Sequence, residues 1–324
     1  DVERSRGLGD VYKRQGVSFE LYKGRTLCVV GESGCGKSVT ASSIMQLLPK
    51  LSRIESGAIT YHSEKGDIRI DQLPRNGKEM RALRGRDIAM IFQDPMTALN
   101  PVYTIGFQIG EDLKYHTDLD KRSRRARTLE LLTQMGISTP EKRIDQYPHE
   151  FSGGMRQRAM IAMAMSCSPK VLIADEPTTA LDVTIQAQVL GMMEELKERF
   201  GTSMLLITHD LGVVAQNCDS VAIIYAGEIV EYGTLSQVYE NTLHPYTEGL
   251  FGSIPNLETN SRRLAAIDGM MPDPTMLPKG CKFADRCKYA EERCHVENPQ
   301  LMELEDGHKA VSYTHLTLPT RSTL

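Results

Sequence analysis

The chain has 324 residues and a formal net charge of −4 at pH 7. This length permits one large hydrophobic core, or one such core with a smaller module. The weakly acidic balance gives no overall field that would attract nucleic acid, and no apolar run approaches the roughly 18–20 residues that a helix needs to span a bilayer. We therefore expect a globular protein without a nucleic-acid partner.

The two ends of the chain differ from the sequence between them. Residues 1–15 show no periodicity and begin with Asp1 rather than Met. Residues 312–324 carry one charge, Arg321, and fit neither a helix nor a patterned strand. We predict that 1–15 and 312–324 are non-native tails, so the fold is predicted from the residues between them.

A glycine-rich loop between a predicted strand and a predicted helix is the first element that indicates chemistry. The strand is the apolar run Thr26–Val30, and the helix runs from Ser38 to Leu48, just before Pro49. The loop reads G-x-x-x-x-G-K-S over Gly31–Ser38, which is the P-loop pattern. Such a loop points backbone N–H groups and a helix N-terminus at phosphate.

The side chains of this P-loop have separate predicted tasks. Lys37 is predicted to lie between the β- and γ-phosphates of a nucleotide, and the Ser38 hydroxyl is predicted to hold Mg²⁺. The glycines allow a close approach that a Cβ would hinder. The predicted nucleotide-binding residues of this segment are Gly31, Ser33, Gly34, Cys35, Gly36, Lys37, Ser38 and Val39. The alternative is a glycine turn that matches the pattern by chance.

Short apolar strands alternate with helices along the rest of the chain. Predicted strands cover Ile88–Phe92, Lys170–Ala174 and Ser203–Thr208, and a predicted hairpin covers Ser220–Tyr232 with its turn at Ala226-Gly227. The pattern is helical from residue 96 to about residue 165. This alternation predicts an α/β fold with a mainly parallel sheet, an antiparallel β part and an inserted helical subdomain.

Polar residues follow three of these strands, at the edge where parallel sheets bind ligands. Asp175 is predicted to hold Mg²⁺, and Glu176 to take a proton from the attacking water. Gln93 can contact both Mg²⁺ and water, and His209 can hydrogen-bond the γ-phosphate. Each of these residues also has a structural interpretation. Asp175 and Glu176 could be an acidic pair at the start of a helix. Gln93 could be a structural glutamine, and His209 a surface or core histidine.

Five elements in this order resemble the ATP-binding subunit of ABC transporters. They are Walker A at Gly31–Ser38, the Q-loop Gln93, the signature Ser152–Gln157, Walker B and the D-loop at Asp175-Glu176 and Thr179–Asp182, and the switch His209. The match covers about Val17 to Gly233. The chain departs from the family's common signature at two positions. It has Met155 where the family has Gln, and it has Phe at position 151, where the signature motif begins, directly before Ser152.

The resemblance implies a P-loop ABC ATPase core that works as a pair of subunits. Ser152, Gly153 and Gly154 would bind the γ-phosphate held by the P-loop of a second, homologous ATPase subunit, and Asp182 would add a D-loop contact. Gly153-Gly154 suits this task because a helix N-terminus exposes N–H groups to anions. Two subunits would then sandwich two ATP molecules head to tail.

Further segments resemble the peptide/nickel uptake branch, the dipeptide- and oligopeptide-permease ATPases. These segments are Gln93–Pro101, Pro148–Met155, His244–Thr247 and Gly280–Cys294. The resemblance implies an ATPase that energises uptake of di- or oligopeptides, or of nickel or another small solute. Its partners would be two transmembrane permease subunits, contacted near residues 93–100, and indirectly an extracytoplasmic solute-binding protein. The chain would lie peripherally on the cytoplasmic face of the inner membrane.

The composition changes from His244 onward, where proline and cysteine become frequent. We predict a nucleotide-binding domain at 16–235, with its helical subdomain at about 96–165, and a small irregular module at 236–311. Within this module Cys281, Cys287 and Cys294 follow a C-x5-C-x6-C spacing that suits metal ligation.

In the branch that the chain resembles, these cysteines and a fourth can ligate a [4Fe–4S] cluster. The fourth would fall near Ser312, and it is absent. The other interpretations are a zinc site that adds His295 or His308, and free reduced cysteines.

Cys35 lies in the P-loop near a helix N-terminus, a position that activates thiols. We predict that alkylating reagents modify it and block ATP binding, and that MgATP protects it. The alternative is an inert loop thiol.

The sequence leaves two other functions open. One is a soluble, non-transport ABC ATPase, although such chains usually carry two cassettes or long coiled-coil inserts. The other is a regulatory module that holds ATP without turnover, which Glu176 and His209 argue against.

Overall fold

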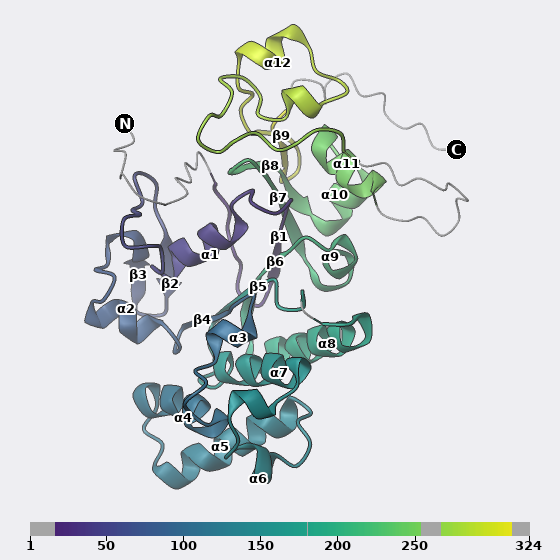
Figure 1. The fold of residues 1–324 in the computed structure, drawn as a ribbon. Helices are drawn as coiled ribbons and strands as arrows, with labels where there is room; N and C mark the ends of the chain where they lie inside the picture. The colour runs from purple at the N-terminus through teal and green to yellow at the C-terminus, as the bar shows by residue number, and fades with distance from the viewer. Residues whose placement is uncertain (1–16, 180, 254–266, 313–324) are drawn as a thin grey trace. The chain divides into compact units, whose positions relative to one another are not determined.

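The computed structural model describes residues 17–179, 181–253 and 267–312 (Figure 1). The predicted tails 1–15 and 312–324 therefore lie outside the described residues, except for Ser312. The described residues form two compact units. The P-loop unit contains Val29–Lys37 and the chain from His209 onward; the helical unit contains Leu21–Cys28 and Ser38–Thr208. The predicted domains 16–235 and 236–311 stay a prediction.

Three parallel strands form the centre of the helical unit. They are β4 (Ile88–Ile91), β5 (Val171–Asp175) and β6 (Ser203–Thr208), adjacent in that order. Ile88 pairs with Val171, and Asp175 pairs with Ile207. Nearly every residue of these strands is buried, because a parallel sheet is covered on both faces and therefore reads as continuous apolar runs. The predicted parallel sheet is confirmed.

Helices fill most of the chain between β4 and β6. They are α3 (Pro95–Ala98), α4 (Ile105–His116), α5 (Lys121–Gln134), α6 (Pro140–Arg143), α7 (Gly153–Ala164) and α8 (Val183–Phe200). Five of them begin where a short polar side chain accepts a backbone N–H, which satisfies one otherwise unpaired donor: Asp94 for α3, Thr104 for α4, Asp120 for α5, Ser152 for α7 and Asp182 for α8. Figure 1 shows α4 to α7 grouped together, below strands β4 to β6 in that view.

The helical unit also contains a small hairpin of β2 (Thr60–Ser63) and β3 (Gly66–Arg69), followed by α2 (Lys78–Leu83). Of all helices that the structure describes, none is long and apolar enough to cross a membrane.

Antiparallel strands dominate the P-loop unit. After α9 (Leu211–Asn217), β7 (Ser220–Tyr225) and β8 (Glu228–Thr234) form the predicted hairpin. Its turn residues Ala226 and Gly227 both have positive φ, as a two-residue hairpin turn with the twist of the strands requires. The helices of this unit after β8 are α10 (Leu235–Glu240), α11 (Pro245–Gly252) and α12 (Glu292–Val296).

The last strands of the described chain extend this antiparallel sheet. β10 (His308–Ala310) pairs with β8, and β9 (Met302–Glu305) pairs with β10. The module predicted at 236–311 is thus joined to the hairpin that precedes it by backbone hydrogen bonds.

A buried carboxylate fixes this junction. The Glu231 carboxylate on β8 contacts His308 Nε2 at 3.0 Å and accepts the N–H groups of Leu243 and His244 at 2.9 and 3.0 Å. Glu231 and His308 are both 0% exposed. One carboxylate therefore joins β8, β10 and the chain before α11.

Removing this carboxylate is expected to destabilise the protein. Glu231→Ala should lower the free energy of unfolding by about 1–3 kcal/mol for each buried donor that it leaves without an acceptor. Urea unfolding followed by circular dichroism measures the change. The matched control is Glu240→Ala, which removes an exposed carboxylate from α10. Equal midpoints for the two variants would contradict this role of Glu231.

Candidate nucleotide site

The P-loop follows β1 (Thr26–Val30) and leads into α1 (Lys37–Ile44), as predicted from its flanks. Gly34 and Gly36 have φ of +82° and +106°, a left-handed backbone that favours glycine. A Cβ at Gly31 would overlap the Ile224 carbonyl oxygen, so no side chain fits there. Three of the predicted glycines are therefore required by the backbone itself.

Lys37 points back into its own loop. Its ammonium group donates to the Gly31 carbonyl at 2.7 Å and to the Glu32 carbonyl at 3.0 Å, and the residue is 5% exposed. These two acceptors are neutral carbonyls, which bind an ammonium less strongly than an anionic phosphate does. The position suits a lysine that exchanges these carbonyls for phosphate oxygens.

Two of the three predicted magnesium ligands, Ser38 and Asp175, meet in the helical unit. Ser38 Oγ, in the first turn of α1, donates to Asp175 Oδ1 at 3.1 Å, at the carboxyl end of β5. Asp175 is 4% exposed. A hydroxyl and a carboxylate are hard oxygen ligands of the kind that Mg²⁺ prefers beside phosphates. The donor set fits the ion that the sequence predicts.

The predicted base and the Q-loop residue also meet. Gln93 Nε2 donates to Glu176 Oε2 at 2.9 Å, and Thr179 Oγ1 donates to the same oxygen at 3.0 Å. Glu176 itself has φ of +48°, a strained conformation for a residue with a Cβ. Such strain is concentrated at functional sites, where the surrounding structure holds it. The two donors and the backbone together restrict where this carboxylate points.

Thr179 is not among the site residues that the sequence predicts as catalytic or ligand-binding. A signal for it exists, because it lies three residues after Glu176 in the same loop and carries a hydroxyl. Periodicity alone does not distinguish such a residue from a turn-forming threonine.

The signature segment forms the start of α7. Ser152 Oγ accepts the Met155 N–H at 3.3 Å, and an added Cβ at Gly153 would meet no atom within 4 Å. The backbone at Gly153 is therefore not covered by other atoms of the described chain, and the contact of Ser152, Gly153 and Gly154 with a γ-phosphate stays a prediction. Asp182 caps α8, because its Oδ1 accepts the Ile185 N–H at 3.0 Å. One carboxylate oxygen of Asp182 is therefore already hydrogen-bonded to the start of its own helix.

His209 belongs to the P-loop unit, where its side chain is exposed directly before α9. The neighbouring Asp210 caps that helix by accepting the Gly212 N–H at 2.8 Å. The contact of His209 with a γ-phosphate stays a prediction.

Cys35 is buried, with 2% of its surface exposed. The prediction of a reactive thiol relies on access to solvent, so this burial favours the inert alternative. We expect native Cys35 to react with maleimide much more slowly than it does in urea, whether or not MgATP is present. Mass spectrometry of the labelled peptide measures this. Rapid labelling of the folded protein that MgATP suppresses would instead restore the first prediction.

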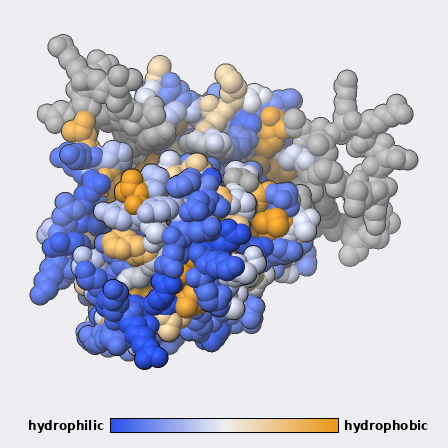
Figure 2. Space-filling model, turned by 60° about the horizontal axis from the view of Figure 1, so that its bottom comes forward, coloured by the Kyte–Doolittle hydropathy of each residue, from blue (hydrophilic) through white to orange (hydrophobic). Residues whose placement is uncertain are grey.

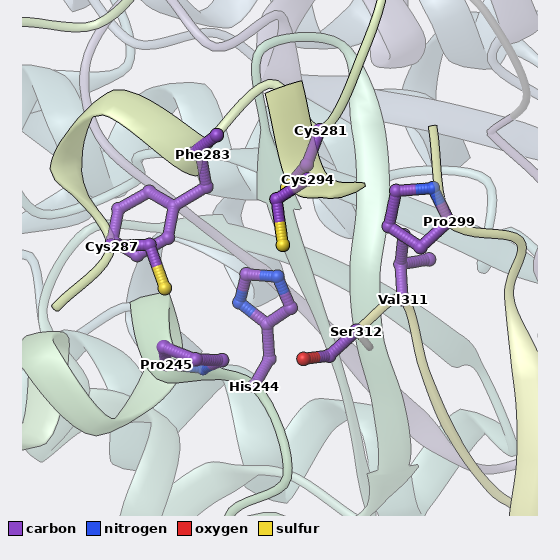
Figure 3. A pocket seen from close by; sticks show the side chains of 10 residues that line it. His244, Pro245, Cys281, Phe283, Cys287, Cys294, Pro299, Val311 and Ser312 are labelled. Atoms are coloured by element: carbon purple, nitrogen blue, oxygen red, sulfur yellow. The ribbon is translucent and has the colours of Figure 1, made fainter. Parts of the chain in front are cut away.

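The three late cysteines gather at one pocket. Figure 3 shows the sulfur atoms of Cys287 and Cys294 beside the His244 ring, with Ser312 on the opposite wall. Cys281 also lines this pocket. Burial raises the pKa of Cys281 to about 11 and also raises that of Cys287.

The sequence offers His295 or His308 as a further zinc ligand beside these cysteines. The two proposed additional ligands do not line the pocket, since His308 is bound to Glu231 and His295 lies 3.6 Å from Asp285. Within residues 17–179, 181–253 and 267–312, no group of His, Cys, Asp or Glu side chains is arranged to hold a metal ion. The iron–sulfur and zinc interpretations are therefore unsupported, and free cysteines remain.

Two family models match the chain. Residues 14–179 match the model described as ABC transporter. The chain belongs to the ABC transporter family. Residues 230–294 match the model of the oligopeptide/dipeptide transporter C-terminal region. The chain is therefore an ATP-binding, ABC-type ATPase.

Curated relatives and solved structures agree with this assignment. The dipeptide transport ATP-binding protein DppD of Bacillus subtilis is 51% identical over 93% of this chain and 88% of its own length. The oligopeptide transport ATP-binding protein OppD of the same organism is 49% identical over 94% of this chain and 84% of its own. A dimeric bacterial ABC transporter cassette is 25% identical with a TM-score of 0.58, over 67% of this chain and 88% of that one.

Proposed function

We propose that this chain is the ATP-hydrolysing subunit of an ABC importer that energises uptake of di- or oligopeptides. The observation that carries the proposal is the match of residues 230–294 to a peptide-transporter region within the same chain as the ATPase motifs. The names of the two Bacillus subtilis relatives support peptide transport in particular. Nickel or another small solute is the alternative cargo within this branch.

The site residues support a mechanism of in-line attack on the γ-phosphate by water. Ser38, Asp175 and Gln93 would hold Mg²⁺, and the bound ion would supply positive charge against the negative charge that builds up on the phosphates. Lys37 leaves its loop carbonyls and binds the β- and γ-phosphates. Glu176 takes the proton of the attacking water as general base.

Gln93 and Thr179 hold Glu176 ready for this step. Each donates to Glu176 Oε2, at 2.9 and 3.0 Å, so the two donors approach the carboxylate at one oxygen and restrict its rotation. A base must lie within hydrogen-bond reach of the proton that it removes, and a carboxylate of fixed orientation meets that requirement more often than a mobile one. His209 would contact the γ-phosphate.

A second ATPase subunit would complete the site. Ser152, Gly153 and Gly154 begin α7 with an open N-terminus, which is suited to the γ-phosphate held by a partner. The dimeric state of the cassette with a similar fold supports a head-to-tail pair, and we propose a homologous, non-identical partner. Asp182 would then contribute at the dimer interface.

The helical unit carries the surface that would meet the permeases. Large exposed apolar side chains follow the Q-loop: Met96, Val102, Tyr103, Phe107 and Tyr115. The surface in Figure 2 is mostly hydrophilic, with apolar side chains in scattered spots. We infer that residues 93–107 contact the two membrane permease subunits, and that the chain lies peripherally on the cytoplasmic face of the inner membrane.

Reconstitution tests the proposal. ATP hydrolysis is measured for the purified chain alone and in proteoliposomes with its co-encoded ATPase, permeases and solute-binding protein, together with uptake of a labelled dipeptide or of nickel. Stimulated hydrolysis with dipeptide uptake is the expected result. Nickel uptake alone would select the other cargo, and equal hydrolysis with and without partners would favour a soluble ATPase.

A further inference from the structure

Arg286 connects the region after the ATPase motifs to the P-loop. It lies on a short 3-10 helix, Ala284–Arg286, and its side chain is 6% exposed. Its Nη1 and Nη2 donate to the two carboxylate oxygens of Glu32, at 2.9 and 3.0 Å. Glu32 is the first variable residue of the P-loop. Two parallel bonds of this kind are among the strongest side-chain contacts, and they also fix orientation.

The rest of the Arg286 side chain is fixed as well. Nε donates to the Asp268 carbonyl at 2.9 Å, and the guanidinium lies over the Tyr225 ring, 5.7 Å from its centroid. Burial acts to lower the pKa of Arg286, but the hydrogen bonds to Glu32 and Tyr225 raise it above its ordinary value. The guanidinium therefore stays charged wherever the protein is folded.

A second side chain from the same region holds the backbone of Glu32. The Glu32 N–H donates to the Tyr246 hydroxyl at 3.0 Å, and Tyr246 on α11 is 0% exposed. Met271 also lies near the loop, because a Cβ added at Gly34 would be 3.4 Å from Met271 Cε. Arg286 and Tyr246 both come after residue 235, and both hydrogen-bond to the predicted phosphate-binding loop.

The negative charge of Glu32 indicates the effect of its ion pair with Arg286. A carboxylate in a phosphate-binding loop repels the anionic phosphates of ATP, and the repulsion grows where water is excluded. The paired guanidinium supplies the opposite charge. Glu32 and Lys37 also share the loop backbone, since the Glu32 carbonyl accepts from the Lys37 ammonium at 3.0 Å. A displaced Glu32 would therefore move an acceptor of the phosphate-binding lysine.

We propose that Arg286 is a positioning residue of the ATP site, through which the region after residue 235 sets the affinity of the P-loop for nucleotide. It neutralises Glu32 and holds the loop in its phosphate-binding shape. This inference rests on the proposed ATPase function. It makes the C-terminal region part of the nucleotide machinery, in addition to any role in transport.

Four variants of the full chain test the inference. Arg286→Met removes the charge and keeps a long apolar stem, and Arg286→Lys keeps the charge without the two parallel bonds. Glu32→Gln and the double variant Glu32→Gln/Arg286→Met complete a double-mutant cycle. Arg293→Gln is the matched control, because Arg293 is an exposed arginine on α12 of the same region. A fluorescent ATP analogue gives Kd, steady-state hydrolysis gives KM and kcat, and thermal unfolding reports stability.

Arg286→Met should raise Kd and KM by about 10-fold, because the loss of a charged hydrogen-bonded pair is of that size. Its kcat at saturating ATP should change by less than about 2-fold, since no group that touches the reacting atoms is altered. Arg286→Lys should fall between Arg286→Met and the parent chain, and Arg293→Gln should match the parent.

The cycle separates the electrostatic role from a merely structural one. Adding Glu32→Gln should recover most of the affinity that Arg286→Met loses, because the repelling carboxylate is gone. Unchanged Kd in Arg286→Met, or an equal loss with and without Glu32→Gln, would overturn the inference while the parent chain still binds nucleotide. A parent chain that binds no nucleotide would overturn the proposed function instead.

Discussion

Glu176→Gln is expected to lower kcat for ATP hydrolysis by about 10²–10⁴-fold, the usual contribution of a general base. The amide keeps the size of the side chain, so Gln93 and Thr179 can still donate to its oxygen. It cannot take a proton from water at neutral pH. The affinity for ATP should stay within about 3-fold of the parent value, because this side chain acts in the transition state.

Two measurements on this variant test the assignment. Hydrolysis is followed in the reconstituted transporter, and ATP binding is followed with a fluorescent analogue. Glu195→Gln is the control, because it removes an exposed carboxylate of α8 without touching the site. If Glu176→Gln hydrolyses ATP at the parent rate, another group is the base and the regulatory interpretation returns.

Runs of apolar residues make the parallel sheet predictable. β4, β5 and β6 are buried on both faces, so their sequences contain no alternation and few polar residues. The residue that ends such a run lies at the edge of the sheet where ligands bind, which is why the sequence predicts a ligand-binding role for Asp175. Short-range patterns and strand ends therefore predict this part of the site.

The length of α1 is less predictable. The sequence predicts a helix from Ser38 to Leu48, but α1 ends at Ile44 and Gln46 has φ of +52°. Arg84, far along the chain, donates to the Gln46 carbonyl at 3.0 Å. A contact between distant segments ends the helix where the local pattern would continue it.

The same limit explains why the sequence does not reveal the contact of Arg286 or the burial of Cys35. The guanidinium of Arg286 reaches Glu32 across 254 residues of chain, and no local pattern encodes that pairing. For Cys35 the motif gives the position in the loop, but its burial depends on how the surrounding residues fold. Partners and exposure are properties of the packed structure, whereas a motif fixes only the order of the residues.

Asp175→Asn is expected to weaken Mg²⁺ binding at the ATP site and to slow hydrolysis. The amide oxygen can still accept the Ser38 hydroxyl, which Asp175 accepts at 3.1 Å, so the fold should persist. The charge that attracts Mg²⁺ is lost, and with it much of the stabilisation that the ion gives to the transferring phosphoryl group. We expect kcat to fall on the order of 10²–10³-fold at millimolar Mg²⁺, which corresponds to several kcal/mol of transition-state stabilisation.

A magnesium titration of hydrolysis separates this effect from a general loss of structure. The Mg²⁺ concentration for half-maximal activity should rise in Asp175→Asn and stay unchanged in Asp118→Asn, which alters an exposed aspartate. The two variants should unfold at similar urea concentrations, since removing a buried charge does not by itself destabilise a fold. If Asp175→Asn keeps the parent dependence on Mg²⁺, then Asp175 is not a magnesium ligand, and its contact with Ser38 serves to hold α1 against β5.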